Sequence, residues 1–264
     1  MTSSIIVEIG EVPVRLSASE PDFLGMMERR YSGFIVSTPS RRPFELTVSV
    51  APGQVSSVED VQVSRHGTVW RFERGDFSAE WSPESGNGSI RQARMNPYSI
   101  DAVLRILHSV LLAPEGGLLL HAASAIRHGR AYVFSGVSGA GKTTISRLAP
   151  PDATLLTDEI SYIRPAGDSY RAFGTPFTGE LAKVGENAAA PLDTVFLLSH
   201  GPENRLTPLA ATDAARALLR NVLFFAQDPE LVQMVFQSVC QLVARVPVRS
   251  LAFTPEPAVW EMIR

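Results

Sequence analysis

The stretch FSGVSGAGKTT, Phe134 to Thr144, follows the apolar residues AYV with three glycines, one lysine and two threonines. Before it, GLLLHAASAI and RAYVFSG are two apolar runs joined by the turn-like segment RHGR, which predicts two strands. After it, KTTISRLA predicts a short helix that Pro150 and Pro151 stop. Strand, glycine-rich loop and helix in this order indicate an α/β fold.

The loop matches the pattern G-x-x-x-x-G-K-[ST] from Gly136 to Thr143 in full. Phosphate oxygens need many donors at close range, and glycines allow a backbone to wrap around them. Lys142 adds a positive charge, and the Thr143 hydroxyl suits a metal ion. The pattern therefore predicts a phosphate-binding loop (a P-loop, or Walker A motif) for ATP and Mg²⁺. Its expected binding residues are Gly136, Val137, Ser138, Gly139, Ala140, Gly141, Lys142, Thr143 and Thr144.

Two acids, Asp158 and Glu159, lie near the end of the apolar run ATLLTDEISYI. An acid at the end of a strand beside a phosphate loop is placed to hold the metal or to accept a proton. Neighbouring strand residues point to opposite faces, so both acids face the phosphates only if the strand ends or kinks there. We expect Asp158 and Thr143 to be metal ligands and both acids to be catalytic. The alternative is a solvated strand terminus.

Among the five histidines, His121 lies inside the apolar run LLLHAAS. Taken alone, it is most simply a hydrogen-bonded core residue. The others show no metal-ligand spacing, so we expect surface or structural roles for His66, His108, His128 and His200. The single cysteine, Cys240, lies in the apolar helical pattern VFQSVCQLV, which predicts a core residue.

The remaining pattern indicates two modules, 1–95 and 96–264. The first has short strand signals, such as SIIVEI, ELTVSV and DVQVSR, and a predicted hairpin TVWRFERGDFSAEW with Trp70 and Phe72 on one face and Phe77, Ala79 and Trp81 on another. SPESGNGS predicts a loop. YSIDAVLRILHSVLLA has helical period, with Ser99 as its predicted N-cap. Later segments predict a strand (TVFLLS), two helices (TDAARALLRNVLFFA and DPELVQMVFQSVCQLVARV) and a last strand (VRSLAFTP).

Composition sets the class of protein. A net charge of −3 argues against a nucleic-acid binder that relies on positive charge. One cysteine excludes an internal disulfide and fits a reducing compartment. No signal peptide and no apolar run of membrane-spanning length is visible. We therefore expect a cytoplasmic protein without nucleic-acid or membrane partners.

HAASAI, GRAYVFSGVSGAGKTT, LLTDEISYI and FGTPFTGE, in this order and spacing, resemble the C-terminal kinase domain of HPr kinase/phosphorylase. That family shares a nucleotide-binding core with phosphoenolpyruvate carboxykinase. The resemblance covers roughly residues 118–264, and the ending VPVRSLAFTPEPAVWEMI looks like a branch of kinase-like proteins from peptide-modification pathways. The implied fold is a P-loop kinase-like α/β domain preceded by a smaller β-rich N-terminal module.

The resemblance also implies roles for residues. His121 falls where the family has a histidine near the transferred phosphate, and Lys142 and Thr143 match its phosphate-binding lysine and metal-binding hydroxyl. Asp158 and Glu159 match two consecutive aspartates that hold Mg²⁺ and activate the acceptor hydroxyl, with glutamate in second place here. FGTPFTGE replaces the family's glycine-rich signature, and we expect a loop near the active site with Glu180 as a third acid.

These inferences favour an ATP-dependent kinase that phosphorylates a serine or threonine hydroxyl on a protein or peptide, with Asp158, Glu159, His121 and Lys142 as catalytic residues. One alternative is a nucleotide-binding regulator without catalysis that docks a partner. Another is a small-molecule kinase or a carboxykinase-like enzyme. Apolar stripes between Thr212 and Val246 would either cover the sheet or form a homo-oligomer interface.

Overall fold

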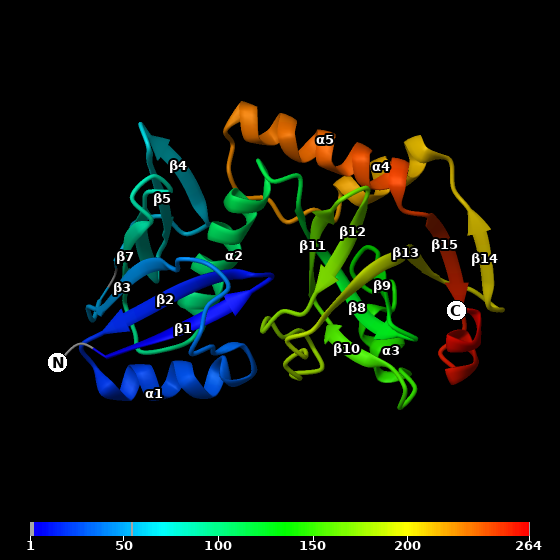
Figure 1. The fold of residues 1–264 in the computed structure, drawn as a ribbon, viewed down its shortest axis with the longest axis horizontal. Helices are drawn as coiled ribbons and strands as arrows, with labels where there is room; N and C mark the ends of the chain where they lie inside the picture. The colour runs from blue at the N-terminus through cyan, green and yellow to red at the C-terminus, as the bar shows by residue number, and fades with distance from the viewer. Residues whose placement is uncertain (1–2, 54, 264) are drawn as a thin grey trace. The chain divides into compact units, whose positions relative to one another are not determined.

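The computed structural model describes residues 3–53 and 55–263 and has a mixed α/β architecture with two sheets (Figure 1). The chain divides into two compact units. Unit 1 comprises Met1–Val110 and Phe224–Val232, and unit 2 comprises Leu111–Leu223 and Gln233–Arg264. The first boundary between them falls inside the helix α2 (Tyr98–Leu112), which the sequence placed at the start of the second module.

Unit 1 contains a seven-stranded sheet in the order β1-β2-β3-β7-β6-β5-β4. The pairs β2–β3 and β3–β7 are parallel, and the other neighbours are antiparallel. SPESGNGS is only partly a loop, because its last residues from Asn87 belong to β7 and pair with β3. The strands are β1 (Ser3–Ile9), β2 (Val12–Ala18), β3 (Phe44–Val50), β4 (Gln62–His66), β5 (Val69–Arg74), β6 (Phe77–Trp81) and β7 (Asn87–Gln92).

The predicted hairpin is β5–β6, but its aromatic residues share one face. Trp70 lies directly opposite Trp81, and Phe72 lies opposite Ala79. Directly opposed residues of an antiparallel pair point to the same side of the sheet. These four side chains and that of Phe77 are all buried, so the prediction of two different faces is wrong.

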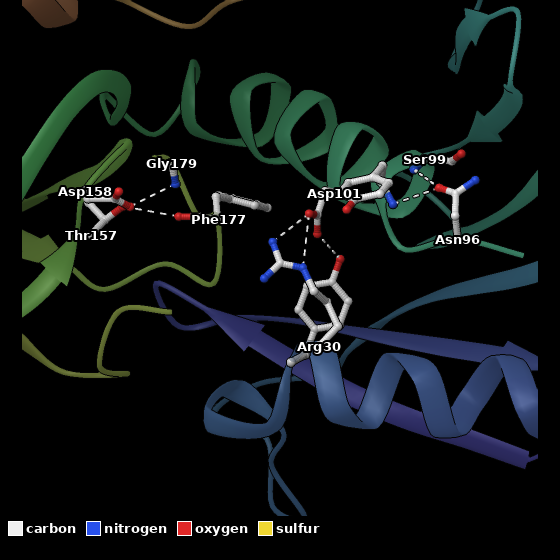
Figure 2. A network of polar contacts seen from close by, with 10 residues as sticks. Arg30, Asn96, Ser99, Asp101, Thr157, Asp158, Phe177 and Gly179 are labelled. Carbon is white, nitrogen blue, oxygen red and sulfur yellow. Dashed lines mark hydrogen bonds and ion pairs between the residues drawn. The ribbon is translucent and has the colours of Figure 1, made fainter. Parts of the chain in front are cut away.

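The helix α1 (Pro21–Arg30) is absent from the sequence predictions. It buries Phe23, Leu24 and Met27 and packs on β1 and β2. A short 3₁₀ turn, η1 (Ser32–Phe34), follows it. Figure 2 shows how α1 is tied to α2: Arg30 donates to one oxygen of Asp101 at 2.7 and 3.2 Å, and the Tyr31 hydroxyl donates to the other at 2.5 Å. Burial and the neighbouring Asp101 charge raise the pKa of Tyr31 well above its ordinary value.

The start of α2 differs from the prediction that Ser99 caps it. The Asn96 side-chain oxygen accepts the N–H groups of Tyr98 and Ser99 at 2.9 and 3.3 Å, so Asn96 does the capping (Figure 2). The Ser99 hydroxyl donates instead to Asp76 at 2.8 Å. Asp76 also accepts two hydrogen bonds from Arg74, so the β5–β6 turn is fastened to the first turn of α2.

Unit 2 contains the eight-stranded sheet, in which β10, β8, β11, β12, β13, β15 and β14 follow one another and β9 pairs with both β8 and β13. Its strands are β8 (Leu118–Arg127), β9 (Arg130–Ser135), β10 (Thr154–Thr157), β11 (Ile160–Ala166), β12 (Ser169–Phe173), β13 (Ala189–His200), β14 (Arg205–Pro208) and β15 (Val248–Phe253). Its helical segments are α3 (Lys142–Arg147), α4 (Ala211–Leu219), most of α5 (Pro229–Arg245) and the 3₁₀ segment η2 (Pro257–Met262).

Strand pairings in unit 2 close a ring: β8 pairs with β9 and β11, β11 with β12, β12 with β13, and β13 with β9. The long strands β8 and β13 make this possible because each changes partner along its length. The first half of β8 pairs with β11, and the second half pairs with β9 on one edge and β10 on the other. The site described below lies where β8 changes partner.

One face of this sheet is covered by α3 and η2. Phe134 of β9 stacks on Phe196 of β13 at 5.6 Å between ring centroids and meets the edge of Trp260 at 5.4 Å. The Trp260 indole N–H donates to the Ile145 carbonyl of α3 at 3.0 Å. Large buried aromatic rings thus fix a helix of only six residues that would be unstable alone.

Two sequence predictions on the helical segments are wrong. TDAARALLRNVLFFA is helical only to Leu219, because Asn221 and Leu223 then bond to the backbone of β8. Cys240 is exposed rather than buried. On α5 the buried residues Val235, Val239 and Leu242 recur at three and four positions, and Cys240 lies beside exposed Phe236 on another face.

No helix in the described ranges is long and apolar enough to cross a membrane.

Candidate functional site

Strand register brings three sequence features to one place. Ala122 of β8 lies opposite Ser135, the last residue of β9 before the glycine-rich loop. His121 lies opposite Ile160, the first residue of β11. The Ala122 N–H donates to the Glu159 carbonyl at 2.9 Å. The loop, the histidine and the acidic pair therefore meet at the middle of β8.

The glycine-rich loop has a backbone that other residues would not adopt. Gly139 and Gly141 have φ of +79° and +105°, in the region that favours glycine. A Cβ on Gly141 would lie 2.6 Å from the Phe253 ring, and one on Gly136 would lie 2.7 Å from the Ala140 side chain. The loop is thus packed closely against β15 and against itself.

Lys142 lies under the loop and is 8% exposed. Its ammonium donates to the carbonyls of Gly136 at 2.9 Å and Val137 at 3.3 Å. Burial lowers the pKa of Lys142, while the negative charges of Glu180 and Glu159 oppose this shift. The cation is therefore desolvated and faces two carboxylates, which suits a group that meets an anionic ligand.

The acidic pair lies at a break in the strand, as the sequence required for both acids to face the loop. Thr157 lies opposite Ser124 and Ile160 opposite His121, with Asp158 and Glu159 between them in a bend. The Thr157 hydroxyl accepts the N–H groups of Glu159 and Ile160 at 3.2 and 3.1 Å. A threonine side chain that takes backbone N–H groups in this way competes with the sheet ladder and interrupts it.

The Asp158 carboxylate is 3% exposed and already bonded. One of its oxygens accepts the N–H of Gly179 and the other accepts the N–H of Leu181, both at 2.9 Å (Figure 2 draws the bond to Gly179). A buried carboxylate needs such donors because its desolvation is costly. Asp158 thus binds to its own protein's backbone, and Glu159 beside it is half-buried.

The segment FGTPFTGE contributes a loop to the site. Both ends of this loop, which we call the 175–186 loop, bond to β10: the Thr175 N–H to the Leu156 carbonyl at 3.1 Å and the Glu186 N–H to the Leu155 carbonyl at 3.0 Å. Its tip carries Glu180, whose carboxylate accepts the Thr143 hydroxyl at 3.2 Å. Glu180 is therefore a third acid beside the glycine-rich loop.

These residues line one cavity of 320 Å³, together with glycines of both loops and hydroxyls of the glycine-rich loop and α3. All four predicted catalytic residues contribute to its wall. Of the predicted binding residues, Gly136, Val137 and Ala140 do not line it: Val137 is 65% exposed, and Ala140 is buried against the sheet. The lining residues are His121, Ser138, Gly139, Gly141, Lys142, Thr143, Thr144, Asp158, Glu159, Gly179 and Glu180.

His200 contacts the glycine-rich loop, a position that no motif in the sequence predicts. Its Nε2 lies 2.7 Å from the Gly139 carbonyl, and its ring stacks on Phe253 at 6.2 Å. β13 and β9 are parallel, with Leu197 beside Ser135, so β13 extends past the point where the loop begins. The sequence shows only that His200 lies at the end of a predicted strand. The order of the strands in the sheet is needed to show that this strand end lies beside the loop.

Comparison with known proteins identifies a family over the second part of the chain. The family model described as "SynChlorMet cassette protein ScmC" matches residues 90–264. No curated protein matches the sequence. Among the solved structures that match is the Hpr(Ser) kinase/phosphatase from Coxiella burnetii, at 10% identity and a TM-score of 0.24 over 45% of this chain and 87% of that one. A likeness this weak leaves the function to be argued from the site.

Proposed function

This chain belongs to the family described as SynChlorMet cassette protein ScmC. We propose that it is an ATP-dependent kinase that transfers a phosphoryl group to a hydroxyl of a protein or peptide. The nucleotide is inferred from the P-loop pattern, and the class of acceptor is inferred from the sequence resemblance to HPr kinase-like proteins. A cytoplasmic location is part of the same proposal.

The observation that carries the proposal is the convergence of unlike groups in one cavity. A glycine-rich backbone, a desolvated ammonium, a hydroxyl and carboxylates line the same 320 Å³. Phosphoryl transfer needs little covalent chemistry from a protein, and it depends on positioning and on charge stabilisation. The groups in this cavity can supply both.

The loop would hold the nucleotide's phosphates. Gly139 and Gly141 adopt the positive φ values of a backbone nest that can present N–H groups to an anion. Lys142 would exchange its bonds to the loop carbonyls for phosphate oxygens. Because burial already lowers the pKa of Lys142, an anionic partner would stabilise its charged form.

The donor set fits a magnesium ion. The Thr143 hydroxyl and the Glu159 and Glu180 carboxylates are hard oxygen ligands of the kind that Mg²⁺ prefers. In the part of the chain that the structure describes, no group of three or more His, Cys, Asp or Glu could hold a metal by itself. Mg²⁺ commonly binds through one or two carboxylates and the substrate's phosphates, and it would supply charge neutralisation there.

In the proposed step, the acceptor hydroxyl loses its proton to Glu159 as its oxygen bonds to the γ-phosphorus. The bond between that phosphorus and the β–γ bridging oxygen breaks, and ADP leaves with the electron pair. Lys142 stabilises the charge that develops on the phosphate oxygens. His121 lines the same cavity and would contact the transferred group.

A regulator that binds nucleotide without catalysis is the second candidate. It is favoured by the state of Asp158, since both of its oxygens accept backbone N–H groups. Such a protein would bind ATP and transfer nothing. The two functions differ in one measurement, which is transfer of labelled γ-phosphate to a peptide or to the protein itself.

Calorimetry with Mg·ATP and a γ-phosphate transfer assay test the proposal on the wild type, Lys142→Ala and Lys183→Ala. Lys183 is exposed and does not line the cavity, so it is the matched control. We expect saturable binding by the wild type and a loss of transfer by roughly 100-fold or more in Lys142→Ala. Full transfer by Lys142→Ala, or no wild-type binding at millimolar ATP, would refute the proposal.

A further inference from the structure

We propose that Asp158 is a positioning residue, the anchor that holds the tip of the 175–186 loop and with it Glu180 over Thr143, and that Glu159 is the member of the acidic pair that accepts the acceptor's proton. The first half of this inference is a statement about the fold. The second half rests on the kinase function proposed above.

The 175–186 loop is held by two kinds of contact. Its ends bond to the Leu155 and Leu156 carbonyls of β10 through backbone groups. Its tip, Gly179–Leu181, bonds to Asp158 through two backbone N–H groups at 2.9 Å. Backbone bonds to β10 therefore hold the ends, whereas the backbone N–H groups of Gly179 and Leu181 at the tip bond to one carboxylate.

Close packing at the tip agrees with this role. A Cβ on Gly179 would lie 3.0 Å from the Asp158 carboxylate and 3.2 Å from the Glu159 Cβ. Such contacts are tighter than most real ones, so glycine lets the tip approach the acidic pair. With 3% exposure, Asp158 also has little surface left for a substrate.

The other two acids differ from Asp158 in what they face. Glu180 accepts the Thr143 hydroxyl, and the charges of Glu180 and Glu159 act on Lys142. A threonine hydroxyl that donates its proton to Glu180 keeps its oxygen lone pairs free for another partner. Glu180 would therefore orient Thr143 without blocking it, provided that Asp158 keeps the tip in place.

Hydrogen exchange of the nucleotide-free protein tests the anchor, with Asp158→Asn as the variant and Glu159→Gln as the matched control. The Asp158→Asn amide replaces one acceptor oxygen by a donor, so the peptide spanning 177–183 should exchange roughly 10- to 100-fold faster, as expected for losing a bond to a charged group. The amides of Thr175 and Glu186 should stay protected. Glu159→Gln should leave the tip's exchange as in the wild type.

A second variant keeps the test decisive if Asp158→Asn fails to fold. Gly179→Ala retains the carboxylate but pushes the tip away from it, so the same peptide should again exchange faster. Unchanged exchange at the tip in these folded variants, or equal acceleration by Glu159→Gln, would overturn the anchor role.

Activity separates the second half of the inference from the first. Glu159→Gln should lose phosphoryl transfer while it binds Mg·ATP with an affinity within a few-fold of the wild type. Asp158→Asn should keep measurable transfer, with KM for the acceptor raised more than kcat is lowered. If Asp158→Asn abolishes transfer while its tip stays protected, Asp158 is itself the reacting carboxylate. If the wild type binds no ATP, the kinase proposal fails and the exchange result still decides the anchor.

Discussion

At the scale of single residues, the site depends on glycines that serve different purposes. Gly141 combines a φ of +105° with contact to Phe253, whereas Gly129 has a φ of +74° in a turn with open space around it. Gly179 has no positive φ to support and is needed only for close approach to Asp158. Glycine is thus required for a different steric reason at each of these three positions.

Substituting Gly141 by alanine should destabilise the protein more than the same change at Gly129. At both positions the left-handed backbone conformation destabilises alanine by about 1–2 kcal/mol. Only at position 141 does the alanine Cβ also overlap an aromatic ring. We expect a loss of roughly 2–4 kcal/mol for Gly141→Ala from strain and overpacking. Denaturant unfolding of the two variants measures the difference, and equal losses would show that Phe253 moves aside freely.

At the scale of elements, the site is built from places where regular structure stops. β10 and β11 both pair with β8, and the bend between them presents Glu159 to the cavity. The same principle works in unit 1, where Asp76 at the β5–β6 turn binds Arg74 and the Ser99 hydroxyl of α2. Side chains at these ends supply the bonds that the ladder no longer makes.

The Asp76 contact should make stability depend on pH. The hydrogen bond from Arg74 lowers the pKa of Asp76 below its usual 3.8, with help from Ser99. Its stabilisation is therefore present above pH 3.8 and is lost as pH falls through the lower folded-state pKa. Asp76→Asn should cost about 1 kcal/mol at pH 7, since water screens this partly exposed pair, and progressively less in acid.

Urea unfolding from pH 7 to pH 2 checks this expectation. Asp213→Asn is the control, because Asp213 pairs with Arg216 on an exposed helix surface and such pairs contribute little. A difference between the wild type and Asp76→Asn that stays constant down to pH 2 would rule out the assigned pKa shift.

At the scale of the whole molecule, the two compact units have different contents. All the residues that line the candidate site lie in unit 2. Unit 1 has its own buried core of aromatic residues and its own buried Arg30–Asp101–Tyr31 contact. A ligand that binds the site should therefore stabilise unit 2 directly.

Hydrogen exchange with and without Mg·ATP measures which unit responds. Protection should appear in peptides from 111–223 and 233–263, and should reach about 2.7 kcal/mol at a ligand concentration of 100 times Kd. Lys142→Ala should show no protection at the same concentration. Equal protection of peptides from 55–110 would mean that nucleotide binding orders unit 1 as well.

Much of unit 2 was predictable because its signals are local. β8, β9 and α3 lie where the apolar runs and glycines place them, and the helical period marks α5; α2, most of which belongs to unit 1, is marked by the same period. Predictions failed where a distant partner decides the conformation. The helix predicted through Asn221 ends before it, because the Asn221 carbonyl accepts a hydrogen bond from the backbone N–H of His121 in β8. The residues Asn87–Ser89 favour a turn but form part of β7, because they pair with β3.

The sequence by itself determined the strand, the glycine-rich loop and the helix around Gly136–Thr143, since periodicity and glycine's backbone freedom act over a few residues. It also marked Asp158 and Glu159 as a pair. Only the tertiary structure decided that they differ: both line the cavity, but Asp158 is bonded to Gly179 and Leu181, whereas the charge of Glu159 acts on Lys142. The physical reason is that a carboxylate's surroundings depend on which backbone N–H groups come near it, and strand register and loop packing set those over long distances in the chain.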